Sequence, residues 1–284
     1  MIVEFKKNKP FVEGICLNDL ISLVETPFYV YSQKSVIDAY SKLKSYLNTE
    51  IFFSVKANSN QAILSLMKSL GVGADAVSIG ELQRALKAGI KPNKIILEGV
   101  GKSLDDIEYA IHNNIRQINI ESMEELNMIN SLGKKVNNKV NIGIRLNPDI
   151  DSQTLNEIST GRKTDKFGIP FDLLPEVCLK IKALDKLHLK GISCHVGSQI
   201  FDINVFKKVF NKMKHATKII EANELSIDHL DLGGGFGVVY NKEKELDLKE
   251  LSLLIKSIFK NSPYNISFEP GRYLVANAGV LITK

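Results

Sequence analysis

Eight short apolar runs, each separated from the next by a stretch of helical periodicity, constrain the fold of this chain more than any other feature. Short β-branched runs that alternate with helical patterns are typical of parallel βα units. The sequence therefore predicts a parallel sheet covered by helices. The runs are IFFSV (51–55), GADAVS (73–78), KIILEG (94–99), RQINIE (116–121), VNIGIRL (140–146), HLKGISCH (188–195), IDHLDLGG (227–234) and NISFEP (265–270).

The stretches between the runs carry the residues that helix ends prefer. Several begin at Ser or Asp and end at Gly, and the SxxE pattern of Ser122 and Glu125 predicts a capping box. The segment KSVIDAYSKLKSYL (34–47) precedes the first run and supplies an eighth helix. We therefore predict an α/β fold, a (β/α)8 TIM barrel over residues 34–270 that starts with a helix. An open doubly wound sheet is the alternative. The other predicted helices lie within 61–71, 79–89, 103–111, 122–133 and 205–222.

Two further segments lie apart from this alternation. Residues 1–33 contain a strand-like start, the helix-like LNDLISLVE and then TPFYVYS, and they do not fit inside the barrel. The charge run KEKELDLKE (242–250) is interpreted as a solvated face.

Composition excludes several classes of protein. The 284 residues include 37 Lys and Arg against 32 Asp and Glu, and no basic run has interleaved aromatics, so no nucleic-acid partner is expected. No uncharged apolar run reaches the roughly 18 residues of a membrane span, so no membrane association is expected. The three cysteines, Cys16, Cys178 and Cys194, have neither disulfide nor zinc spacing, and the histidines have no metal spacing. We predict a cytoplasmic protein without a bound metal.

Ligands of TIM barrels bind at the carboxyl ends of the strands, so the residues that finish the apolar runs are the candidates. A lysine held among apolar barrel walls, as predicted for Lys56, can lose its proton near neutral pH and attack a carbonyl carbon. The consecutive glycines of LGGGFG (232–237) can direct backbone N–H groups at an anion. The candidates are Lys56, Asp75, Glu98, Glu121, Arg145, His195, the turn at Gly233, Gly234 and Gly235, Glu269 and Arg272.

Each candidate alone also has a purely structural interpretation. Lys56 could be a solvated lysine, His195 a hydrogen-bonded wall residue, and Glu269 a structural acid. In a closed barrel, however, the eighth strand neighbours the first, which brings Glu269 close to Lys56. An aldehyde-reactive lysine, a phosphate-binding turn and an acid that keeps a pyridine nitrogen protonated are the three requirements of a pyridoxal 5'-phosphate site.

The motifs at these positions resemble one known family. Taken together they are similar to the pyridoxal phosphate-dependent decarboxylases of ornithine, diaminopimelate and arginine, whose barrel is of the alanine-racemase type. The stretch ISTGRKTDKFGI resembles the members that act on diaminopimelate, so the resemblance implies release of CO2 from meso-diaminopimelate to give L-lysine, in lysine biosynthesis. The segments are FFSVKANSN (52–60), GADAVSIGEL (73–82), LNPDIDSQTLNEISTGRKTDKFGI (146–169), CHVGSQI (194–200), LDLGGGFG (230–237) and FEPGRYLVANAG (268–279).

The resemblance also implies a role for each residue at the catalytic centre. Lys56 binds the aldehyde carbon of the cofactor covalently, and Asp75 lies beside it. His195 stacks on the cofactor ring, and Glu269 pairs with the pyridine nitrogen. Lys56, His195 and Glu269 are thus the expected catalytic residues.

The remaining expected contacts surround the phosphate and the substrate. Ser198 and the turn Gly233, Gly234 and Gly235 bind the phosphate. Arg145 is a barrel-wall arginine near the cofactor, and Arg272 binds the phosphate or the substrate carboxylate. Ser54 stands where the family commonly has alanine, which a barrel wall should tolerate.

Family members continue past the EPGR segment into a second, β-rich domain. The resemblance implies that residues 1–33 belong to that domain, that residues 271–284 begin it, and that the protein is a homodimer when the domain is present. The domain ordinarily supplies a Cys-Glu segment and a tyrosine, which have no match here. Three functions stay open: the decarboxylase, a decarboxylase of another basic amino acid, and a non-catalytic cofactor-binding barrel or regulator of a full-length relative.

Overall fold

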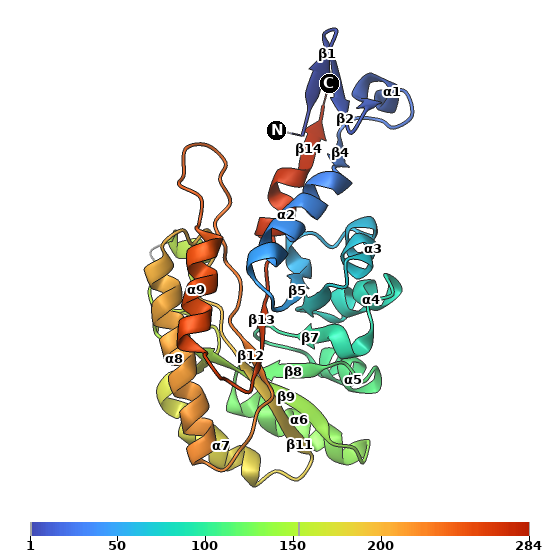
Figure 1. Ribbon diagram of the computed structural model, residues 1–284. Helices are drawn as coiled ribbons and strands as arrows, with labels where there is room; N and C mark the ends of the chain where they lie inside the picture. Colours follow the sequence, from blue (N-terminus) through green and yellow to red (C-terminus); the bar gives the residue numbers. More distant parts are fainter. Residues whose placement is uncertain (1, 153, 284) are drawn as a thin grey trace.

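The centre of the molecule is a closed barrel of parallel strands. The computed structural model describes residues 2–152 and 154–283. Within these residues eight strands pair in the order β9, β11, β12, β13, β5, β6, β7, β8, and β8 pairs again with β9 (Figure 1). The predicted barrel is confirmed, and the open sheet is excluded because the pairings form a complete ring, in which β13 pairs with β5 and β8 pairs with β9. The strands are β5 (Glu50–Ser54), β6 (Gly73–Ala76), β7 (Ile95–Leu97), β8 (Gln117–Ile120), β9 (Val140–Asn147), β11 (Leu187–Ser193), β12 (His229–Asp231) and β13 (Asn265–Phe268).

Helices connect the strands and cover the outside of the barrel (Figure 1). Helix α9 begins inside the charge run 242–250, where Leu246 and Leu248 are buried and Asp247 is the N-cap. The interpretation of this whole run as a solvated face is therefore wrong, because its two leucines pack into the core. The helices are α2 (Gln33–Tyr46), α3 (Gln61–Ser69), α4 (Ile79–Lys87), α5 (Leu104–His112), α6 (Met123–Lys135), α7 (Leu174–Lys182), α8 (Ile203–Ala222) and α9 (Leu248–Ile258).

The capping box predicted at Ser122 forms only in part. The Ser122 hydroxyl accepts the Glu125 N–H at 3.2 Å. The Glu125 carboxylate does not return to Ser122; it accepts the Glu121 N–H and binds the buried Lys102. A complete capping box closes instead at the start of α5, between Ser103 and Asp106.

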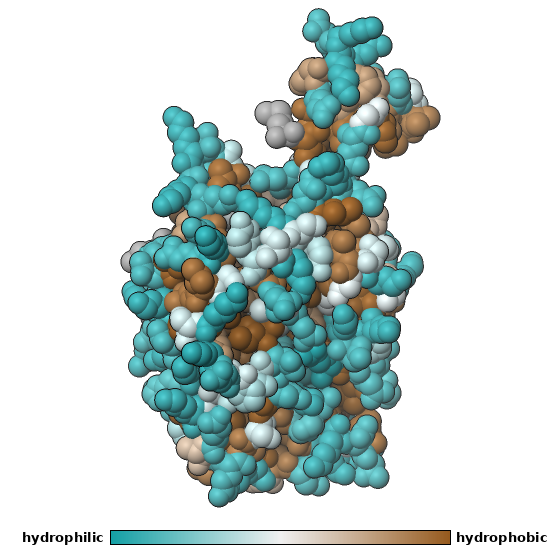
Figure 2. All heavy atoms as spheres, viewed as in Figure 1, coloured by the Kyte–Doolittle hydropathy of each residue, from teal (hydrophilic) through white to brown (hydrophobic). Residues whose placement is uncertain are grey.

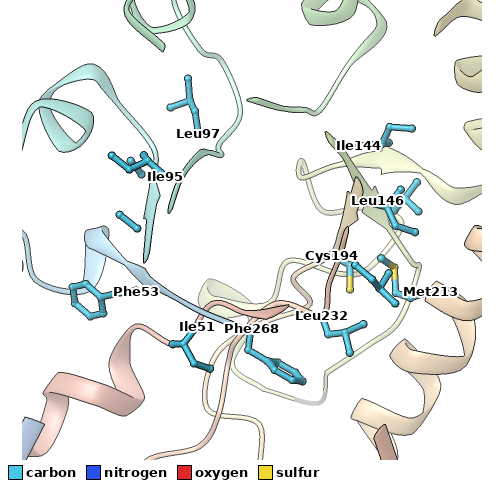
Figure 3. Packing of buried hydrophobic residues seen from close by; sticks show 14 of the residues in the cluster. Ile51, Phe53, Ile95, Leu97, Ile144, Leu146, Cys194, Met213, Leu232 and Phe268 are labelled. Carbon is cyan, nitrogen blue, oxygen red and sulfur yellow. The ribbon is translucent and has the colours of Figure 1, made fainter. Parts of the chain in front are cut away.

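Alternate residues of each strand face two different environments. On β5, Ile51 and Phe53 point to the helices and join the main apolar cluster, as Figure 3 shows. On β13, Phe268 packs against rings of the helical side, 6.2 Å from Phe210 and 5.4 Å from Phe236 between ring centroids. Burying such a side chain contributes about 1.5–3 kcal/mol. The opposite face of the strands, which lines the barrel interior, carries polar side chains and leads to the site described below.

A small lobe projects from the barrel (Figure 1). Strand β4 pairs antiparallel with β14, so a segment near the start of the chain lies beside the last described strand there. Apolar side chains such as Phe5 and Leu23 are exposed on this lobe, which shows brown patches in Figure 2. The lobe holds β1 (Glu4–Lys6), β2 (Lys9–Val12), β3 (Ile15–Cys16), α1 (Leu17–Ile21), β4 (Phe28–Tyr31) and β14 (Gly279–Ile282); the short elements β10 (Ile169–Pro170) and α10 (Arg272–Val275) lie elsewhere.

Three features of the described residues bear on what the fold can bind. None of the helices formed by residues 2–152 and 154–283 is long and apolar enough to cross a membrane. The same residues contain no group of three or more His, Cys, Asp or Glu side chains that could hold a metal ion. Cys16, Cys178 and Cys194 are unpaired and buried.

Candidate active site

A pocket of about 500 Å³ opens at the carboxyl ends of the barrel strands. It brings together residues from the end of β5 and from the segments that follow β5, β11, β12 and β13. A larger pocket, of about 710 Å³, lies at the opposite end of the barrel around Glu50 and Asn265, where strands begin and none of the predicted site residues is found. The predicted residues that line the smaller pocket are Lys56, His195, Ser198, Gly235, Glu269 and Arg272.

Lys56 lies in a single 3-10 turn that follows β5 directly. Its Nζ atom is 2.9 Å from Asp75 Oδ2, and its side chain is 50% exposed, whereas that of Asp75 is fully buried. Burial alone would lower the pKa of Lys56, but the carboxylates of Asp75 and Glu269 outweigh it and raise the pKa. The prediction of a lysine that loses its proton among apolar walls is therefore wrong for the protein without cofactor, because the walls near Lys56 carry carboxylates.

Ser54 is a site residue whose importance the sequence did not indicate. Its hydroxyl donates to Asp75 Oδ2 at 2.7 Å and lies 3.1 Å from the Glu269 carbonyl oxygen. It thereby joins β5, β6 and β13 at the base of the pocket. Together with Lys56, Ser54 gives the same Asp75 oxygen two donors, which fixes this carboxylate beside the amine.

His195 follows β11 and presents a neutral ring to the pocket. Burial, helped by the positive charges of Lys56 and Arg145, lowers the pKa of His195 to about 3. Its Nδ1 atom accepts the N–H of Gly234 at 3.3 Å. A neutral, oriented imidazole of this kind suits stacking on another flat ring.

The glycine turn after β12 is packed too tightly for side chains. Gly233 and Gly235 have φ angles of +73° and +82°, which favour glycine. A Cβ atom on Gly234 would lie 2.2 Å from the Glu269 carbonyl oxygen, and one on Gly235 would lie 2.2 Å from that of Gly197. The turn is therefore wedged between the strand of Glu269 and the loop of His195. Only Gly235 of the three lines the pocket; the Gly233 N–H is taken by Asp231.

Gly234→Ala is expected to weaken cofactor binding and to lower the free energy of unfolding by roughly 1–3 kcal/mol, as overpacking does. The added methyl group would push the turn away from Glu269. Urea denaturation and titration with pyridoxal phosphate measure both effects. Gly80→Ala in α4 is the control, because the nearest atom lies 3.9 Å away and no loss of stability is expected. Equal behaviour of the two variants would contradict the tight packing inferred for the turn.

Glu269 follows β13 directly and is a buried acid that is only 5% exposed. Its Oε1 atom is buried and has no hydrogen-bond partner within the described residues. Burial raises the pKa of Glu269 well above its usual value, and the carboxylates of Asp231, Asp75 and Glu98 raise it further. An unpartnered acid at a pocket wall calls for a partner from the ligand, since buried polar atoms are normally hydrogen-bonded.

The mouth of the pocket is formed by Arg272, Ser198 and Tyr240. The Arg272 guanidinium donates to the Ser198 hydroxyl at 3.1 Å and lies 3.4 Å from the Tyr240 hydroxyl. Tyr240, which lies in an irregular loop without a recognisable motif, gave no signal in the sequence. Arg272 is exposed, so it is available to an anionic group that enters.

Arg145 is not among the residues that line the pocket. Its guanidinium lies 2.9 Å from Glu121 Oε1 and 3.7 Å from Glu98 Oε2, and it is 5.0 Å from the Phe167 ring centroid. The structure thus places Arg145 deeper in the barrel wall, where it balances the charge of two carboxylates. Asp75 and Gly234 do not line the pocket either; they contact residues that do, Asp75 through Lys56 and Gly234 through His195.

These groups together fit pyridoxal phosphate. The pocket offers an amine at Lys56, a neutral ring at His195 and an unpartnered acid at Glu269, with the glycine turn at one edge. These are the groups that an aldehyde, an aromatic ring, a pyridine nitrogen and a phosphate require. The fit rests on the unpartnered Glu269 oxygen and on a turn that the Cβ of any other residue would fill.

Comparisons with known proteins agree with this fit. Residues 33–276 match the family described as "Pyridoxal-dependent decarboxylase, pyridoxal binding domain". Diaminopimelate decarboxylase from Aquifex aeolicus is 37% identical over 284 residues, which cover 99% of this chain and 68% of that protein. The crystal structure of diaminopimelate decarboxylase from Helicobacter pylori complexed with L-lysine is 38% identical, with a TM-score of 0.90 over 93% of this chain and 68% of that one. Lysine decarboxylase from Selenomonas ruminantium shares the fold, at 24% identity and a TM-score of 0.82.

Proposed function

Since the chain belongs to the pyridoxal-dependent decarboxylases, we propose that it binds pyridoxal phosphate in the barrel-mouth pocket and removes CO2 from meso-diaminopimelate to form L-lysine. The observation that carries this proposal is the convergence of Lys56, His195 and Glu269 on one pocket. The substrate is proposed from relatives of which this chain spans about two thirds of the length, 68% and 67% for two of them.

The residues of the chain divide the chemical work between them. When bound, pyridoxal phosphate supplies an electron sink that stabilises the negative charge left as CO2 departs. Lys56 binds the cofactor aldehyde, with Asp75 holding the amine in place. Glu269 would hold a proton at the pyridine nitrogen, and the neutral His195 ring would stack on the cofactor. These roles are part of the proposal.

Residues at the edge of the pocket bind the anionic groups of the cofactor and the substrate. Ser198 and Gly235, which line the pocket, bind the phosphate through hydroxyl and backbone donors, while Gly233 and Gly234, whose N–H groups bond to Asp231 and His195, hold the turn in place. Arg272 binds the phosphate or the substrate carboxylate, and its exposure supports that role. Arg145 acts near the cofactor through the carboxylates that it neutralises rather than by lining the pocket.

The wider organisation is also proposed. Residues 1–33 and 271–284 belong to one β-rich domain, separate from the barrel at 34–270, and the antiparallel pairing of β4 with β14 supports this division. A homodimer is proposed from the family resemblance. The three unpaired cysteines support a cytoplasmic location, since reducing compartments keep thiols free.

An assay of CO2 release tests the proposed reaction. The purified chain, loaded with pyridoxal phosphate, is expected to release CO2 from meso-diaminopimelate and to form L-lysine in equal amount. Ornithine, arginine and lysine serve as competing substrates, and faster release from one of them would move the assignment to another basic amino acid. Tight cofactor binding without CO2 release from any of the four would favour a non-catalytic barrel.

A further inference from the structure

A chain of three buried polar side chains lies beneath the glycine turn. Asp231 accepts the Gly233 N–H through Oδ1 at 2.8 Å, and its Oδ2 is hydrogen-bonded to the Ser267 hydroxyl. Ser267 Oγ in turn lies 2.7 Å from His229 Nε2. Asp231 and Ser267 are 0% exposed and His229 is 1% exposed. None of these three residues has a part in the proposed function as stated so far.

These three hydrogen-bonded side chains connect two parts of the site. Asp231 on β12 and Ser267 on β13 are register partners. Each precedes a site residue by two positions, Asp231 before Gly233 and Ser267 before Glu269. The strands also join above the pair, because the Glu269 N–H donates to the Gly233 carbonyl at 2.7 Å. The orientation of the turn and that of Glu269 are therefore set by one local network.

The glycines themselves cannot fix their own orientation. They have no side chains to pack, and glycine at positive φ has wide conformational freedom. Of the groups that hold the first residue of the turn, the Asp231 carboxyl is the one supplied by a side chain. A fully buried carboxyl is costly to maintain unless its hydrogen bonds are made, so its presence here indicates a structural demand at this point.

We propose that Asp231 is a positioning residue for cofactor binding: supported by Ser267 and His229, it fixes the first N–H of the glycine turn and thereby orients the rest of the turn toward the phosphate of pyridoxal phosphate. The proposal rests on the proposed function, since it concerns the same cofactor. It assigns Asp231 an effect on the phosphate end of the ligand and none on the aldehyde end, which Lys56 binds.

The protonation states of Asp231 and His229 guide the choice of variants. Burial raises the pKa of Asp231 to about 7, and burial lowers the pKa of His229 to about 3. A neutral group at position 231 can thus satisfy the same partners. In Asp231→Asn, the amide oxygen accepts the Gly233 N–H and the amide nitrogen donates to Ser267, whose hydroxyl then donates to His229. Asp231→Ala leaves the Gly233 N–H and the Ser267 hydroxyl without this partner.

The test compares pyridoxal phosphate with pyridoxal, which has the same aldehyde and ring but lacks the phosphate. Affinity is measured from the visible absorption that covalent attachment to a lysine produces. Asp231→Ala is expected to lose roughly 10- to 100-fold in affinity for pyridoxal phosphate, the range for leaving a buried hydrogen-bond donor without its partner, and little for pyridoxal. Asp231→Asn is expected to bind both as the wild type does.

The outcomes separate the proposal from a general loss of structure and from failure of the proposed function. Equal losses for both ligands in Asp231→Ala, or no loss for either, would overturn it. Thermal unfolding without ligand reports whether the variant is folded; if it is not, Ser267→Ala takes its place and should show a smaller loss in the same direction. Failure of the wild type to bind pyridoxal phosphate would refute the proposed function itself and this proposal with it.

Discussion

Replacing Lys56 by alanine is expected to abolish both the covalent attachment of pyridoxal phosphate and the release of CO2. Among the described residues that line the pocket, Lys56 supplies the one amine. The nucleophile that attaches the aldehyde is then absent, and no neighbouring lysine can replace it. Absorption spectra of the variant with added cofactor should show no visible band, and an assay with diaminopimelate should show no CO2.

Two variants make this prediction specific to the amine. Lys56→Arg keeps a positive charge beside Asp75 but provides a guanidinium that does not form the bond, so it should fold normally and still show no band. Lys34→Ala removes an exposed lysine on α2 that pairs with Asp38 and should leave the spectrum unchanged. A normal visible band in Lys56→Ala would show that another residue attaches the cofactor.

Glu269→Gln is expected to lower turnover by about 10²- to 10⁴-fold, the range for a positioned group that handles a proton. The amide keeps the shape of the side chain but cannot hold a proton at the pyridine nitrogen as a carboxylate does. Because Lys56 is untouched, the visible band should persist while the turnover number falls. An unchanged turnover number would remove Glu269 from the catalytic residues.

The same variant has a predicted effect on stability without cofactor. The pKa of Glu269 is raised in the folded chain, so the folded state binds this proton more tightly than the unfolded state does. The free energy of unfolding should therefore fall as the pH rises from the unfolded pKa toward the folded one. In Glu269→Gln this contribution is absent, and urea denaturation across that range should show a shallower fall than in the wild type.

The barrel could be predicted from sequence because its signals are local. Each strand lies in a short apolar run, and several of the helices between the strands begin at Ser or Asp or end at Gly. The interpretation of the run 242–250 as a solvated face was wrong for the converse reason. Charged residues surround Leu246 and Leu248 in the sequence, and only the folded barrel shows that both leucines are buried. At Ser122 the predicted capping box is incomplete because the Glu125 carboxylate binds Lys102, which lies 23 residues away in the sequence.

The site could be predicted only in its outline. Lys56, His195, Glu269 and Arg272 stand at strand ends, which a barrel brings to one place. Their protonation states depend on contacts across strands that no sequence pattern specifies, such as that of Lys56 with Asp75. Ser54, Asp231 and Tyr240 were not among the predicted site residues either, because the role of a single polar residue in a strand or loop is evident only once its neighbours are known.

The most direct test of the account is to identify the lysine that binds the cofactor. The chain is mixed with pyridoxal phosphate, reduced with borohydride to make the attachment permanent, and digested for mass spectrometry. We predict that the label lies on Lys56 at one equivalent per chain and that free phosphate competes with its formation. Label spread over surface lysines, with Lys56 unmodified, would contradict the assignment of this pocket as the pyridoxal phosphate site.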